Sequence, residues 1–192
     1  MSAPPSSWLQ ERVAGQVWWY RAPLLVVFAW MLDGYLDDRA YYSLFDGINL
    51  GFHEMGHAAF MLFGNRILTT AGGTIFQLGI PVIAGAYLLH KQRDPFGAAV
   101  CVFWLGTALV GAGIYAADAR AQDLPLVSPF GPVDVDSHDW TVMLMKYGKL
   151  SQDERIGSAL QRAGIFLMFA SLVVSAWVLR AMAVATRARP SE

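Results

Sequence analysis

The stretch FGAAVCVFWLGTALVGAGIYAA, residues 96–117, contains no Lys, Arg, Asp or Glu. A helix needs about 20 apolar residues to cross the hydrocarbon core of a bilayer, and this stretch supplies them. Gly106, Gly111 and Gly113 recur within it, and small residues let membrane helices approach one another closely. The stretch therefore predicts a membrane-spanning helix that packs tightly against its neighbours.

Four further apolar segments lie on either side of this stretch, at residues 22–36, 48–63, 71–89 and 163–184. The last two are also long enough to cross a bilayer, whereas Asp33 interrupts the first and the second is short. We therefore expect an all-α fold: a polytopic membrane helix bundle with about five apolar segments, built as a single membrane domain over residues 1–192. A polar connecting region, residues 118–161, is expected to hold a loop and a short helix between the last two segments.

The composition also indicates a membrane protein. Hydrophobic residues make up 55% of the chain and charged residues 15%, and the apolar residues fall in long blocks. We expect a multi-pass integral protein in contact with the lipid bilayer, in the cytoplasmic (inner) membrane if the source is bacterial. The 14 Lys and Arg are dispersed and the net charge is -1, which argues against a nucleic-acid partner. Nothing in the sequence indicates an oligomeric state.

The segment INLGFHEMGHAAFMLF, residues 48–63, carries an H-E-x-x-H pentapeptide. On a helix His53 and His57 lie on one face, where both imidazoles can reach one Zn²⁺ at about 2.0 to 2.1 Å. Glu54 lies between them and can act as a general base on a metal-bound water. Ionisable groups are costly in hydrocarbon, so three of them in an apolar run indicate a function. The motif predicts Zn²⁺ as the cofactor, two histidine ligands and a catalytic glutamate.

A catalytic zinc usually takes three protein ligands, so the motif alone does not complete the site. The other two histidines are His90 and His138. The cationic residues that follow His90 disfavour a metal ion there. His138 belongs to VDVDSHDW, residues 133–140, the densest group of metal-binding side chains outside the motif. Within that group the third ligand is either His138 or Asp139, and Asp118 is the main remaining candidate.

The same group has a structural alternative. A short amphipathic helix is expected over residues 138–147, with Ser137 as its N-cap. In that case Asp136, Ser137 and Asp139 can simply satisfy the amide groups and the positive dipole at the start of the helix.

Two amides in the apolar segments are candidates for contact with the substrate or with a ligand. Asn49 lies four residues before His53, where it can orient that imidazole through its outer nitrogen or cap the helix at the membrane edge. Gln77 can bind a substrate backbone, or satisfy the carbonyl group that Pro81 leaves free one turn earlier.

The sequence GFHEMGHA at residues 51–58, followed by an apolar segment with Gly72 and Gly73 near its start, resembles the site-2 protease family of intramembrane zinc metalloproteases. The likeness covers about residues 46–90. It implies that His53 and His57 bind zinc and that Glu54 is the base. The third ligand of the family is an Asp in an N-x-x-P-x-P-x-L-D-G motif on a later membrane helix, and this chain lacks that motif. The resemblance is therefore to a divergent branch.

The leading expectation is thus a zinc metalloendopeptidase that hydrolyses a peptide bond in a membrane-embedded or membrane-proximal protein substrate. The alternative is a non-catalytic membrane scaffold or partner-binding protein that keeps a protease-like site. A lipid hydrolase or an oxygen-activating di-iron enzyme is a third reading, although four histidines are too few for the His-rich di-iron membrane hydroxylases.

Overall fold

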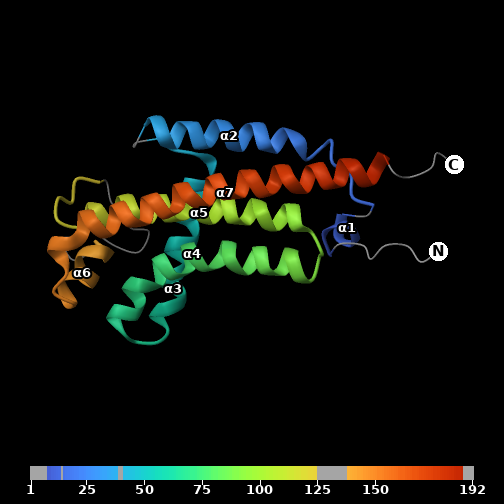
Figure 1. Ribbon diagram of the computed structural model, residues 1–192. Helices are drawn as coiled ribbons and strands as arrows, with labels where there is room; N and C mark the ends of the chain where they lie inside the picture. Colours follow the sequence, from blue (N-terminus) through green and yellow to red (C-terminus); the bar gives the residue numbers. More distant parts are fainter. Residues whose placement is uncertain (1–7, 14, 39–40, 125–137, 188–192) are drawn as a thin grey trace. The chain divides into compact units, whose positions relative to one another are not determined.

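The computed structural model describes residues 8–13, 15–38, 41–124 and 138–187, and these residues form helices and loops with no strand among them. The all-α class is therefore confirmed for the described part of the chain. The helices follow one another as shown in Figure 1: α1 Trp8–Val13, α2 Ala22–Asp37, α3 Leu44–Met61, α4 Arg66–His90, α5 Pro95–Ala117, α6 Asp139–Lys146, a 3₁₀ turn at Leu150–Gln152, and α7 Asp153–Arg187.

Three helical stretches in the described residues are long and apolar enough to span a membrane: α4, α5, and the Leu150–Thr186 stretch, which includes all of α7 except its last residue. They contain the three segments that the sequence marks as long enough to cross. The other two expected segments fall in α2, which has 16 residues, and α3, which has 18, and neither is among these spans. Each of the five apolar segments thus coincides with a helix, although α3 ends at Met61, two residues before the expected end of its segment, and three of the helices have the length and hydropathy of membrane spans.

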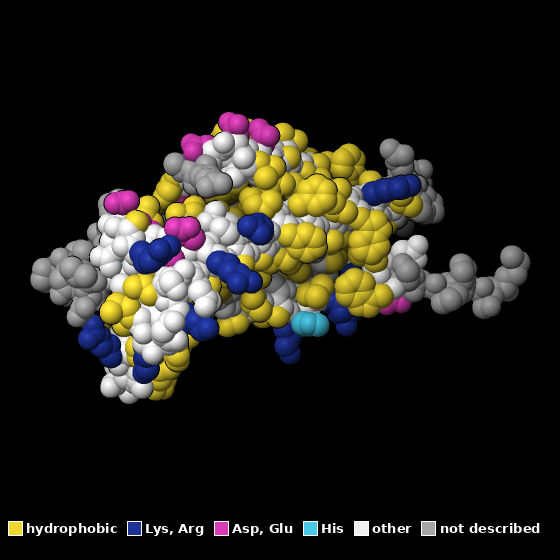
Figure 2. Space-filling view, turned by 60° about the vertical axis from the view of Figure 1, so that its left-hand side comes forward, with side chains coloured by type: hydrophobic (Ala, Val, Ile, Leu, Met, Phe, Trp, Pro, Cys, Tyr) yellow, Lys and Arg dark blue, Asp and Glu magenta, His cyan; other side chains and the backbone are white. Residues whose placement is uncertain are grey.

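Large hydrophobic side chains are abundant on the surface. Trp30, Phe166 and Trp177 are each more than half exposed, and hydrophobic side chains cover much of the face seen in Figure 2. Such a surface is unfavourable in water but suits contact with lipid chains. The surface and the three long apolar helices together fit an integral membrane protein.

The contacts divide the chain into two compact units, and α4, α5 and α7 each contribute to both. The first unit comprises residues 1–41, 81–104 and 167–192. Its core joins α1 to the start of α5 and to α7 through six buried residues: Leu9, Val13, Phe96, Val178, Leu179 and Met182. An ion pair of 2.7 Å between Arg21 and Asp94 links the start of α2 to the start of α5.

The second unit comprises residues 42–80 and 105–166 and contains the whole H-E-x-x-H motif. Its helices cross at glycines. A Cβ atom on Gly56 of α3 would lie 2.2 Å from the carbonyl oxygen of Gly72 in α4. A Cβ atom on Gly157 of α7 would lie 2.4 Å from the carbonyl oxygen of Gly113 in α5. The backbones are therefore in direct contact at both crossings, which fixes the register of the helices around the motif.

The crossing of α5 and α7 gives a testable stability difference. Gly157→Ala forces a methyl group against the α5 backbone, and overpacking of this kind costs about 1–3 kcal/mol. We expect the variant to unfold at a lower temperature than the wild type in detergent micelles, followed by circular dichroism. Gly51→Ala is the matched control, because a Cβ atom there meets nothing within 4 Å, and alanine should add up to about 1 kcal/mol of helix stability. Equal unfolding temperatures for the two variants would contradict the close crossing.

Candidate metal centre

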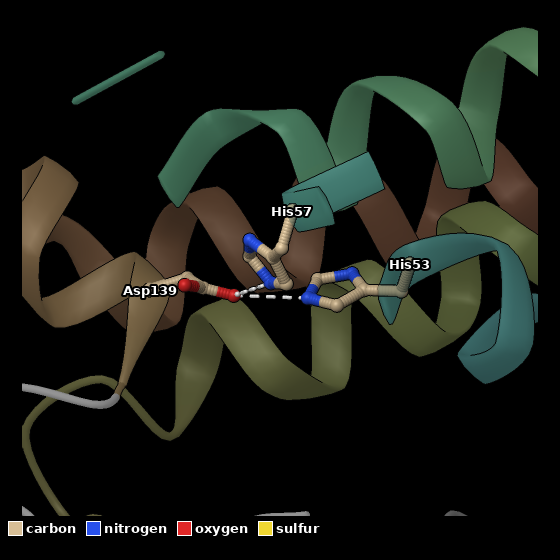
Figure 3. A group of neighbouring side chains, drawn as sticks. All are labelled: His53, His57 and Asp139. Carbon is tan, nitrogen blue, oxygen red and sulfur yellow. Dashed lines mark hydrogen bonds and ion pairs between the residues drawn. The ribbon is translucent and has the colours of Figure 1, made fainter. Parts of the chain in front are cut away.

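Three side chains converge in the second unit (Figure 3): His53 and His57 from α3, and Asp139 from the first turn of α6. The Oδ2 atom of Asp139 lies 2.9 Å from Nε2 of His53 and 3.1 Å from Nε2 of His57. One potential ligand atom from each residue lies within 4.8 Å of the other two. This group can therefore hold a metal ion.

The local structure of α3 explains how the two histidines come to face the same point. The helix begins at a cap in which the backbone N–H and the hydroxyl of Ser43 both donate to Oδ2 of Asp46, at 2.7 Å each. From this start, residues four apart lie on one face. The ring centroids of His53 and His57 are 4.8 Å apart, so the imidazoles form one wall of the site.

The Nδ1 atom of His53, the ring nitrogen that does not contact Asp139, has a partner that fixes the tautomer of the ring. The side-chain NH₂ of Gln77 donates to the carbonyl oxygen of Ala108 at 3.0 Å, which turns its Oε1 atom toward His53. That oxygen lies 3.0 Å from Nδ1 of His53. Because the oxygen can only accept, Nδ1 carries the hydrogen and Nε2 presents its lone pair.

His57 is held in the same tautomer as His53. Its Nδ1 atom lies 2.9 Å from the carbonyl oxygen of Thr69, which can only accept, so Nδ1 is the donor and Nε2 again presents a lone pair. Two nitrogen lone pairs and the carboxylate of Asp139 then face one another. Such an arrangement is stable only with positive charge between the groups, supplied by a proton or by a metal ion.

A glycine keeps the remaining side of the site open. A Cβ atom on Gly73 of α4 would lie 2.6 Å from Nε2 of His53 and 2.7 Å from Nε2 of His57. Any larger residue would therefore press on both potential ligand atoms. Gly73 leaves the space in which an ion held by the two histidines would lie.

The two adjacent residues at the start of α6, His138 and Asp139, differ in charge. Burial alone would raise the pKa of the Asp139 carboxyl, but its contacts with His53 and His57 more than offset that effect, so this pKa lies below its ordinary value. For the His138 imidazole burial has the opposite effect and lowers the pKa, and this effect outweighs the influence of Asp118, which would raise it. At neutral pH Asp139 is therefore an anion and His138 is neutral.

Of the residues considered for the third ligand, Asp139 lies at the two histidines and His138 points elsewhere. His138 is the N-cap of α6, and its Nδ1 atom accepts from the backbone N–H of Thr141 at 3.3 Å. Its Nε2 atom lies 3.4 Å from Oδ2 of Asp118. The expected cap, Ser137, and the nearby Asp136 lie outside the described residues.

The two amide side chains have different partners from those considered in the sequence analysis. Gln77 contacts His53 and the backbone of α5, and it thereby makes the imidazole contact that was considered for Asn49. Asn49 instead donates to Oγ1 of Thr107 at 3.2 Å, and both residues are buried.

Tyr115 and Glu54 complete the surroundings. The hydroxyl oxygen of Tyr115, near the end of α5, accepts from the backbone N–H of Asp139 at 3.1 Å, a contact that no sequence pattern indicated. Glu54 is half-buried on α3, and it is close enough to His57 and Tyr115 for its charge to act on both. Glu54 thus provides a carboxylate that is near the ligand group but is not a member of it.

Comparisons with protein-family models, with curated proteins and with solved structures find no match to this chain. The chemistry of the site is therefore what indicates the function.

Proposed function

We propose that the protein is a membrane-embedded zinc metallopeptidase, similar to site-2 proteases, that hydrolyses a peptide bond in a membrane-embedded or membrane-proximal protein. The observation that carries this proposal is the convergence of His53, His57 and Asp139, with both imidazoles held in the tautomer that presents Nε2. Glu54 on the same helix supplies the base that the chemistry needs.

The donor set fits zinc. Two neutral imidazoles and one carboxylate are typical of a catalytic zinc site that leaves its fourth position free. Ligands about 2.0 to 2.1 Å from a tetrahedral ion are separated by about 3.3 Å. The Asp139 oxygen lies 2.9 and 3.1 Å from the two nitrogens, so it needs to move away from each of them by only a few tenths of an ångström.

Zinc at this position supplies Lewis-acid chemistry, which polarises a carbonyl group and lowers the pKa of water. Glu54 takes the proton of the attacking water and returns it to the nitrogen of the leaving amine. Gln77 and the carbonyl of Thr69 hold the two imidazoles in place through their outer nitrogens during both steps.

The place of these residues along the helices supports a substrate bond near the edge of the membrane. Gly73 and Gln77 lie about 10 to 17 Å along α4 from its first residue, at about 1.5 Å per residue. Tyr115 is in the last turn of α5, and Asp139 lies in the polar region that follows. The centre is therefore near the end of α5 and within the first half of α4, where water from the polar region after α5 and an unwound segment of a membrane protein have access.

Metal analysis tests the proposal directly. Wild-type protein purified in mild detergent without chelators should contain about one zinc per chain, measured by inductively coupled plasma mass spectrometry. His53→Ala should contain almost none, because one of three protein ligands is lost. His90→Ala is the matched control and should keep the zinc, since His90 is not a member of the ligand group. A wild-type protein that holds no zinc, or that prefers iron over zinc, would overturn the proposed function.

A further inference from the structure

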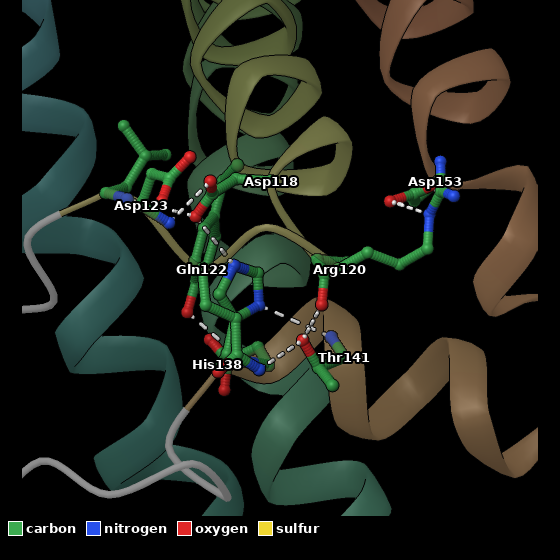
Figure 4. A network of polar contacts seen from close by, with 11 residues as sticks. Asp118, Arg120, Gln122, Asp123, His138, Thr141 and Asp153 are labelled. Carbon is green, nitrogen blue, oxygen red and sulfur yellow. Dashed lines mark hydrogen bonds and ion pairs between the residues drawn. The ribbon is translucent and has the colours of Figure 1, made fainter.

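The third member of the ligand group is on a short helix. Asp139 is the first residue of α6, which has 8 residues, too few for a helix to be stable on its own in water. The direction of the Asp139 carboxylate therefore depends on contacts between the start of α6 and the rest of the second unit. Figure 4 shows that these contacts are polar and lead to residues at and just after the end of α5.

His138 is the centre of this network. Its side chain is fully buried, at 0% exposure. The backbone N–H of Thr141 donates to Nδ1 at 3.3 Å, so in the neutral ring Nε2 carries the hydrogen. Nε2 makes no hydrogen bond of ordinary geometry among the described residues, but it lies 3.4 Å from Oδ2 of Asp118, within ion-pair distance. The ring of Tyr115 covers the imidazole, with the two centroids 4.3 Å apart.

Asp118 is itself held in place. Its Oδ1 atom accepts from the backbone N–H of Asp123 at 2.9 Å, and its Oδ2 atom accepts from the backbone N–H of Leu124 at 3.2 Å. The turn after α5 thus fixes the carboxylate with one oxygen toward His138. A buried donor that faces a fixed carboxylate defines the position of the imidazole and, through it, of the residue that follows.

Three further hydrogen bonds hold Asp139 and Thr141 in place. Its own backbone N–H donates to the hydroxyl of Tyr115 at 3.1 Å. The hydroxyl of Thr141, two residues later, donates to the carbonyl oxygen of Ala119 and accepts from the side chain of Gln122. The residue before Asp139, its own backbone and the residue two positions after it are therefore all attached to residues 115–122.

We propose that His138 and Asp118 form a positioning pair that aims the Asp139 carboxylate at His53 and His57. The pair does not bind the metal itself and acts through Asp139. This inference rests on the metal centre proposed above. Removal of an outer group that holds a metal ligand typically costs about 10- to 100-fold in metal affinity, and this is the loss we expect here.

The test uses Co²⁺ as a spectroscopic probe in the full-length protein. His138→Asn keeps an N-cap acceptor for the Thr141 N–H but is too short to reach Asp118. Asp118→Asn removes the charge and keeps the shape. Both variants should bind Co²⁺ about 10- to 100-fold more weakly than the wild type in competition with a chelator, and the visible absorption of their Co²⁺ forms should change because the Asp139 ligand shifts. Asp123→Asn is the matched control, since the exposed Asp123 contributes only its backbone N–H.

The possible outcomes separate the two proposals. A wild type that binds neither Zn²⁺ nor Co²⁺ would overturn the metal centre and this inference with it. A wild type that binds Co²⁺, with both variants equal to it in affinity and spectrum, would overturn the positioning role alone. The same holds if the variants only lower the unfolding temperature of the metal-free protein while the folded fraction keeps the wild-type Co²⁺ spectrum, because the pair would then stabilise the fold without directing Asp139.

Discussion

Gly73→Ala is expected to abolish metal binding in a protein that still folds. The added Cβ atom would lie 2.6 and 2.7 Å from the Nε2 atoms of His53 and His57, closer than such atoms approach without displacement. Both imidazoles must then turn or move away, yet their outer nitrogens are held by Gln77 and by the backbone of Thr69. The loss of affinity should therefore exceed the roughly 10- to 100-fold typical of losing one hydrogen-bond partner of a ligand.

The natural control lies on the same helix. A Cβ atom on Gly79 meets nothing within 4 Å, so Gly79→Ala makes the same chemical change in α4 without entering the site. Zinc titration of both variants, with the helix content checked by circular dichroism, distinguishes a local effect on the ligands from a general effect on α4. Zinc bound by Gly73→Ala as tightly as by Gly79→Ala would mean that the ion does not lie between the two Nε2 atoms.

The helices could be predicted from the sequence because their signals are local. An uncharged stretch as long as residues 96–117 indicates a membrane-spanning helix. Three of the five apolar segments lie in helices of spanning length. The start of α6 is the instructive exception. Ser137 was expected as the N-cap, but His138 has that role. The prediction missed it because capping preferences of residue types do not include the packing of the His138 ring against Tyr115.

The candidate site was predictable where it depends on a single helix and not where it depends on several. The spacing of His53 and His57 places both on one face of α3 in any structure. The choice between His138 and Asp139 could not be made, because adjacent residues point in different directions and their directions depend on where the helix starts. The contact of Gln77 with His53 depends on the register of α4 against α3, which the crossing of Gly56 and Gly72 sets.

Glu54→Gln is expected to separate metal binding from catalysis. Glu54 is not a member of the ligand group, so the variant should keep about one zinc per chain. An amide cannot take a proton from water, and loss of a general base typically slows a reaction by about 10²- to 10⁴-fold. Membranes from cells that express the wild type should therefore contain new protein N-termini, detected by mass spectrometry of labelled termini, that are missing when Glu54→Gln is expressed at the same level.

Glu154→Gln is the matched control for this experiment. It makes the same change at an exposed carboxylate that pairs with Arg120, so it should leave the pattern of N-termini unchanged. If Glu54→Gln and the wild type give the same N-termini and the same cellular phenotype, whereas Gly56→Leu disrupts the α3 and α4 crossing and abolishes the phenotype, the protein is a membrane scaffold. The two functions differ at this point because a scaffold depends on helix packing alone, whereas a peptidase also needs the proton that Glu54 carries.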